Sequence, residues 1–129
     1  MILLDTHALV WMVAEPGRLS GQALAAVRRA EREGGIAISA ITLWELASHL
    51  ARGRIRAYGT VDASVRVFIE GIVVRPITPE IAALATQFPD DYSRDPADRL
   101  IGATARVEGL PLVTRDENIR RSPLLRTVW

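Results

Sequence analysis

The sequence contains four acidic residues that stand where an apolar run ends or a helical segment begins. Asp5 and Asp116 each follow a short apolar run that is typical of a buried strand. Glu45 and Asp98 stand near the start of segments with helical periodicity. Because ligands bind at the carboxyl edge of an open parallel sheet, we expect these four carboxylates to share one crevice at that edge.

Carboxylates that share a crevice repel one another and raise each other's pKa values unless a cation compensates. Mg²⁺ and Mn²⁺ prefer oxygen ligands, whereas zinc favours Cys or paired His ligands, and this chain has no Cys and only two His. A bound divalent cation can activate water for attack on a phosphodiester. The residue types therefore point to a metal-dependent phosphodiester hydrolase whose catalytic residues and metal ligands are Asp5, Glu45, Asp98 and Asp116.

Each strand-end acid also has a purely structural interpretation. Asp5 or Asp116 alone is explained well as a helix cap or a turn residue. Glu45 stands three residues after Thr42, which is the spacing of a capping box. The functional interpretation therefore depends on all the acids reaching one edge of the sheet.

The segment from Arg94 to Ile101 predicts a helix that begins with Asp95 as its cap and a proline at its first position. Asp95 is thus mainly a capping residue. Asp98 lies at the head of an apolar stripe that continues through Ile101 and Ala105. A carboxylate in that position needs a hydrogen-bonding partner or a metal ion.

Strand-like and helix-like segments alternate along the chain, which indicates an α/β domain with a parallel sheet. Ser20 is a suitable cap for a helix that Gly34 ends, and Gly109 ends the helix that contains Asp98. Residues 52–60 and 87–94 are predicted to be surface connections. The predicted strands, all of them expected to be buried, are Ile2-Leu3-Leu4, Ile36-Ala37-Ile38, Val73-Val74 and Leu112-Val113.

The composition is that of a globular protein with one domain. The 129 residues have room for a single core, so residues 1–129 are predicted to form one domain. The formal net charge of +1 gives no bulk attraction to nucleic acid or to anionic membranes. The absence of Cys, of a secretory signal and of a long apolar run predicts a cytoplasmic protein that does not contact the membrane.

Four ordered motifs resemble those of PIN-domain nucleases, and most closely those of the VapC-type toxins of prokaryotic toxin-antitoxin pairs. The resemblance extends over essentially the whole chain. It rests on Leu3-Leu4-Asp5-Thr6-His7, Ser39 to Leu46, Asp95-Pro96-Ala97-Asp98-Arg99-Leu100-Ile101 and Leu112-Val113-Thr114-Arg115-Asp116.

The resemblance implies a PIN-like fold, with a central parallel sheet of about five strands and helices on both faces. It implies that the four acids bind Mg²⁺ or Mn²⁺ and that the protein cuts RNA endonucleolytically. Thr114, with Thr6 or Ser39, is implied to orient ligands or water, and Asp95 is implied only as a supporting residue. It also implies a homodimer and a VapB-like antitoxin, whose helical segment would fill an apolar groove for which Trp11, Trp44 and Leu50 are candidates.

Other functions fit the same residues less well. A catalytically silent PIN-fold module could use the acidic crevice only to bind a partner or RNA, and it is the main alternative. A phosphoacceptor domain would need a paired Lys, which the sequence lacks. His7 and His49 form no recognisable catalytic motif, and the alternating arginines Arg52, Arg54 and Arg56 are more typical of a solvated face than of an RNA contact.

Overall fold

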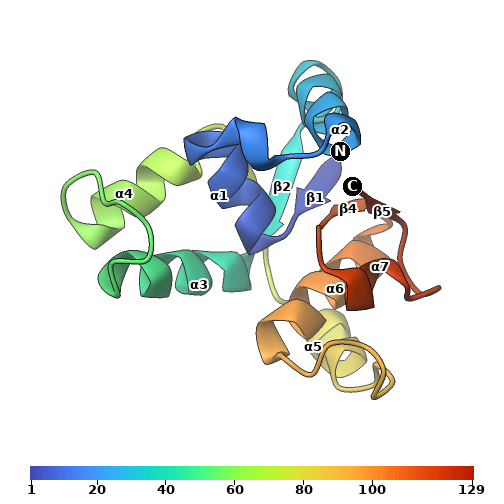
Figure 1. Ribbon diagram of the computed structural model, residues 1–129. Helices are drawn as coiled ribbons and strands as arrows, with labels where there is room; N and C mark the ends of the chain where they lie inside the picture. Colours follow the sequence, from blue (N-terminus) through green and yellow to red (C-terminus); the bar gives the residue numbers. More distant parts are fainter.

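In the computed structural model, which describes residues 1–129, strands and helices alternate as the sequence predicts. Figure 1 shows the arrangement of these elements around the sheet. The strands are β1 (Ile2–Leu4), β2 (Ile36–Ser39), β3 (Val73–Arg75), β4 (Leu112–Val113) and β5 (Thr127–Val128). The helices are α1 (Thr6–Ala14), the 3₁₀ turn η1 (Pro16–Arg18), α2 (Gly21–Arg32), α3 (Ala40–Ala51), α4 (Val61–Phe68), α5 (Pro79–Ala85), α6 (Pro96–Glu108) and α7 (Glu117–Arg120).

The five strands form one sheet in the order β3-β2-β1-β4-β5, and every pairing is parallel. This result confirms the predicted α/β fold with a central parallel sheet. Because β1 and β4 are adjacent, Asp5 and Asp116, which come after these strands, lie near each other at the carboxyl edge of the sheet. The interpretation of 73–74 as a buried strand was wrong, since Val73 is 41% exposed in β3, which is an edge strand.

Side chains of the central strands alternate between two hydrophobic cores, one on each face of the sheet. Leu4 and Val113 join the core formed with α1 and α2. Leu3 and Leu112 join the core formed with α5 and α6. Figure 1 shows these two pairs of helices on opposite sides of the strands, so the prediction of helices on both faces is confirmed.

The capping interpretation of Thr42 was wrong. Helix α3 begins at Ala40, with the Ser39 hydroxyl accepting a hydrogen bond from the Ile41 N–H at 3.3 Å. Strand β2 passes directly into the helix, so the cap lies three residues earlier than the sequence pattern suggested. Glu45 consequently lies in the second turn of α3, where its side chain is free for another role.

The connection at residues 87–94 was predicted to lie on the surface, but two of its side chains, Phe88 and Tyr92, are buried against α6. Arg99 fastens this connection by donating hydrogen bonds to the carbonyls of Phe88 and Ser93 at 2.8 and 2.9 Å. Gly102 leaves room for the aromatic rings, since a Cβ there would collide with the Tyr92 hydroxyl. The segment before Asp98 is therefore held firmly on the helix that carries Asp98.

None of the helices combines the length and the apolar character that crossing a membrane requires.

Candidate active site

A cleft of about 560 Å³ opens beside the carboxyl ends of β1 and β4. Six carboxylates line it, those of Asp5, Glu45, Asp95, Asp98, Asp116 and Glu117. Two arginines, Arg115 and Arg120, also line the cleft, yet none of the six acids forms an ion pair. The structure thus brings together the four acids that the sequence singled out, and it leaves a marked excess of negative charge in the cleft.

Asp5 lies between the carboxyl end of β1 and the start of α1. Its side chain accepts a hydrogen bond from the Ala8 N–H at 2.8 Å, so it caps the helix as well as facing the cleft. Only 8% of the residue is exposed. Burial raises the pKa of the Asp5 carboxyl above its ordinary value, while the Thr114 side chain and the Ala8 N–H act in the opposite direction.

Thr6 connects the first helix to Glu45. Its Oγ1 lies 2.6 Å from Oε1 of Glu45 and 3.2 Å from the Thr42 hydroxyl. Because a hydroxyl has a single proton, Thr6 donates it to the carboxylate, which is the stronger acceptor. Thr6 therefore fixes the direction of the Glu45 side chain across the gap between α1 and α3.

Asp98 accepts a 2.6 Å hydrogen bond from the Ser93 hydroxyl on its Oδ2. Burial, followed by the charges of Asp95, Asp116 and Glu45, raises the pKa of Asp98 to about 6, against the opposing effect of Ser93. The sequence predicts that this carboxylate needs a hydrogen-bonding partner or a metal ion, and Ser93 is a hydrogen-bonding partner. An uncompensated cluster of negative charge still surrounds it.

The other predicted residues take capping positions around the cleft. Asp116 caps α7 by accepting from the Ile119 N–H at 3.1 Å, and Asp95 caps α6 by accepting from the Ala97 N–H at 3.4 Å. Thr114 is fully buried, and its hydroxyl accepts from the Asp116 N–H at 3.1 Å. Ser39 is fully buried as the cap of α3 and does not line the cleft.

Three kinds of residue in or around this cleft were not predicted from the sequence. Ser93 gave no signal except its position just before the Asp95 cap. Glu117 directly follows Asp116 and was detectable as a neighbouring acid. Arg115 and Arg120 lie on the same short segment, and only the turn into α7 directs them toward the cleft.

The two histidines lie side by side at the cleft's border, with ring centroids 6.0 Å apart. His7 lines the cleft, whereas His49 does not. Burial and the neighbouring His7 lower the pKa of His49 below its ordinary value. His49 is therefore neutral near pH 7 and adds no positive charge to offset the acids.

The candidates for an apolar docking groove separate into different environments. Leu50 is only 5% exposed and belongs to the core, so naming it as a surface candidate was wrong. Trp11 is also largely buried, and it packs its ring against His7 and Trp129. Trp44, which is 64% exposed on α3, presents its ring to solvent. Helical periodicity could not tell the buried face with Leu50 from the exposed face with Trp44, because α3 is apolar on more than one side.

Residues 2–123 match the family model described as the PIN domain. The chain belongs to the PIN-domain family. Within the family it is 40% identical to the ribonuclease VapC22 of Mycobacterium tuberculosis over 130 residues, covering 99% of this chain and 98% of that protein. The resemblance to VapC-type PIN domains that the four motifs indicated is therefore confirmed.

Solved structures agree on the fold. The VapBC2 structure from Rickettsia felis, bound to a promoter DNA fragment, superposes with a TM-score of 0.76 at 19% identity, covering 98% of this chain and 97% of that chain. A DNA-bound VapBC structure from Salmonella typhimurium gives a TM-score of 0.71 at 24% identity, with 98% and 97% covered.

The donor set of this PIN domain fits a hard divalent cation. Its carboxylates supply oxygen alone, and the raised pKa values of Asp5 and Asp98 reflect a site that positive charge would relieve. In the structure, no three His, Asp or Glu side chains are close enough together to hold one ion. Mg²⁺ keeps several of its waters and uses only one or two carboxylates directly, so such close clustering is not required.

Proposed function

We propose that this PIN domain is a Mg²⁺- or Mn²⁺-dependent endoribonuclease and the toxin of a VapBC-like toxin-antitoxin pair. The observation that carries the proposal is the acidic cleft, where carboxylates from four separate segments of the chain face one space without arginine partners. The 40% identity to a protein named ribonuclease VapC22 supports RNA as the substrate.

The chain's own residues would hold the cation and orient the reactants. Asp5, Glu45, Asp98 and Asp116 are proposed to hold the cation, one or two of them directly and the others through its bound waters. Mg²⁺ or Mn²⁺ would supply the chemistry of activating water and neutralising charge on the phosphodiester. Thr6 holds Glu45 in place, and Ser93 holds Asp98. These hydrogen bonds restrict the carboxylates before substrate arrives, which lowers the cost of arranging them in the transition state.

The proposed partner is a VapB-like antitoxin, because the solved relatives from Rickettsia felis and Salmonella typhimurium are VapBC structures. A cytoplasmic location and a homodimer complete the proposal. Light scattering of the purified protein tests the homodimer directly, since a mass near twice 14.2 kDa is expected.

The decisive experiment is cleavage of RNA by purified protein with and without Mg²⁺ or Mn²⁺. Cleavage is expected only with metal, and Asp5→Asn should lower it by about a thousandfold, equivalent to roughly 4 kcal/mol. Asn keeps an oxygen that can accept the Ala8 N–H, so the variant should still fold, as circular dichroism can check. Cleavage in the presence of chelator, or an unchanged rate in Asp5→Asn, would contradict the mechanism.

Expression in cells tests the toxin role separately. Growth should stop when the wild-type chain is expressed and continue when Asp5→Asn is expressed. Co-expression of a small reading frame adjacent to the gene should restore growth. A folded protein that neither arrests growth nor cleaves RNA with metal would instead support the catalytically silent binding module.

A further inference from the structure

A second groove, of about 550 Å³, adjoins the acidic cleft. The two share His7 and Trp11 in their linings, so one surface runs continuously from the acids into this groove. Its walls come from α1 and η1 on one side and from the connection between α3 and α4 on the other. Figure 1 shows that connection looping out beside α4.

The groove has the opposite charge to the cleft. Its arginines are Arg18, Arg54 and Arg56, and its one acid, Glu15, is already paired with Arg18 at 3.3 Å. The side chains of Arg54 and Arg56 are exposed and make neither an ion pair nor a hydrogen bond within the chain. Two guanidinium groups therefore remain available to an anionic ligand.

Aromatic rings lie among these basic groups. The Arg18 guanidinium stands over the Trp11 ring at 4.8 Å from its centroid. Tyr58 lines the groove and is 50% exposed, with its ring supported by Phe68 at a centroid distance of 6.1 Å. Tyr58 is thus the ring that is free to stack, while Trp11 is largely buried. Proteins bind single-stranded nucleic acid with guanidinium groups beside an exposed aromatic ring, because the phosphates pair with the guanidinium groups and a base stacks on the ring.

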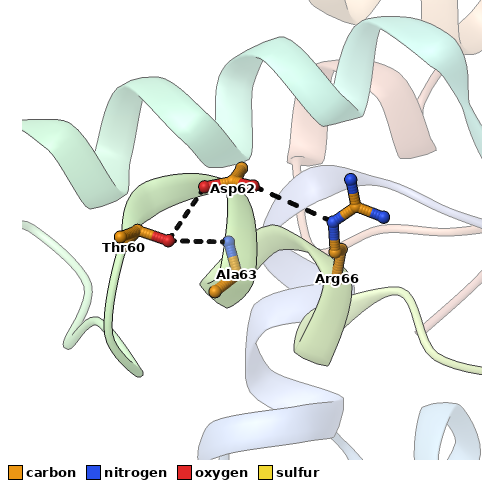
Figure 2. Close-up of polar contacts among 4 residues, drawn as sticks. All are labelled: Thr60, Asp62, Ala63 and Arg66. Carbon is orange, nitrogen blue, oxygen red and sulfur yellow. Dashed lines mark hydrogen bonds and ion pairs between the residues drawn. The ribbon is translucent and has the colours of Figure 1, made fainter.

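The connection that presents these groups is anchored at its far end. The Tyr58 N–H donates to the buried Ser64 hydroxyl at 2.7 Å. Figure 2 shows Thr60 capping α4, where its Oγ1 accepts from the Ala63 N–H at 3.3 Å and donates to Asp62 at 2.8 Å. Asp62 in turn pairs with Arg66 at 3.9 Å. The arginines therefore extend from a connection with a defined path.

We propose that this groove binds the single-stranded RNA backbone that continues from the phosphodiester held in the acidic cleft. This inference rests on the proposed nuclease function and names the path of its substrate. A cation bound in the cleft neutralises the scissile phosphate, but the six carboxylates still repel the phosphates on either side of it. The adjoining surface with unpaired arginines is where those phosphates gain attraction, and Tyr58 offers a ring for one base.

The test compares two double variants that remove the same charge. Arg54→Gln/Arg56→Gln alters the groove, whereas Arg28→Gln/Arg32→Gln alters exposed arginines on α2 that line neither the cleft nor the groove. Binding of a labelled single-stranded RNA is measured in the Asp5→Asn background across a range of salt concentrations. Cleavage by the otherwise wild-type chain is measured in parallel with Mg²⁺.

The groove variant is expected to bind RNA about tenfold more weakly than the control, with a slope of log K against log salt that is shallower by about 1.4. Its KM should rise by a similar factor while kcat stays the same, because the cleft is untouched. Arg54→Lys/Arg56→Lys should restore most of the salt slope, since it restores the charge.

The experiment distinguishes a wrong groove proposal from a wrong nuclease proposal. If the wild type cleaves RNA but the groove variant matches its control in affinity, salt slope and KM, the groove proposal is overturned and the nuclease stands. If affinity depends on the two arginines but no RNA is cleaved, the groove stands and the nuclease fails. If the arginines matter only for binding a helical peptide from the antitoxin, the groove is a protein-docking surface and the RNA path is overturned.

Discussion

The acidic cleft and the basic groove share His7 and Trp11, yet the chain constructs them in different ways. In the cleft, carboxylates stand at the ends of strands and helices and accept hydrogen bonds from N–H or hydroxyl groups, as Asp5 and Asp98 do. In the groove, Arg54 and Arg56 extend from an irregular connection without partners. In the proposed nuclease, the cleft would set the position of the reacting phosphate, whereas the groove would supply adaptable attraction.

The largest effect after loss of a metal ligand should come from Thr6→Val. The variant keeps the volume of Thr6 but removes the hydroxyl that donates to Glu45, so it should lower cleavage by about 10- to 100-fold through a weakened metal site. Affinity for Mn²⁺, measured by calorimetry, should fall with it while RNA binding in the groove persists.

Thr86→Val makes the same chemical change at an exposed site outside the cleft, so it is the matched control. Equal activity in the two variants would mean that Glu45 needs no help from Thr6 and that the cleft is no better organised than the groove.

The pH dependence of metal binding should be the next largest effect. Metal binds the ionised carboxylate, and the pKa of Asp98 is raised to about 6. The affinity for Mn²⁺ should therefore fall as the pH drops below 6, approaching about tenfold per unit. Calorimetry between pH 7 and 5 measures this change, and Asp98→Asn should bind more weakly and lose that part of the pH dependence.

The stability of the metal-free protein should change with pH in the opposite direction to the affinity for Mn²⁺. The pKa of Asp98 rises from an ordinary value of 3.8 to about 6 on folding, so the folded chain binds more protons than the unfolded chain between these values. Its contribution to stability is thus lost as pH rises through that window. Urea unfolding of the metal-free protein should find Asp98→Asn gaining stability relative to wild type over the same range, and a constant difference would count against the raised pKa.

The smallest effect should follow Thr60→Ala, which removes the cap of α4 (Figure 2). Thr60 lines neither the acidic cleft nor the basic groove. The free energy of unfolding should fall by about 1 kcal/mol. Because the connection loses its anchor, KM for RNA should rise slightly while kcat is unchanged. A fall in kcat instead would show that the groove's scaffold also positions the cleft.

Local patterns predicted much of the fold and the residues of the cleft. The apolar runs before Asp5 and Asp116 located two central strands, and Asp95 with Pro96 located the start of α6. These predictions succeeded because strand burial and helix capping depend on neighbouring residues. The cap of α3 was placed incorrectly because Ser39 and Thr42 are both good capping residues, and only the continuation of β2 into the helix decides between them.

The sequence by itself determined that neither thiolates nor lysine are available to this protein's chemistry. It also determined which acids stand at the ends of elements. Only the tertiary structure decided that Ser93 would hold Asp98, that Thr6 would reach Glu45 and that Arg18 and Arg54 would line one groove. The last two of these pairs join residues more than thirty positions apart. Such contacts arise from the packing of whole helices on the sheet, which no local periodicity encodes.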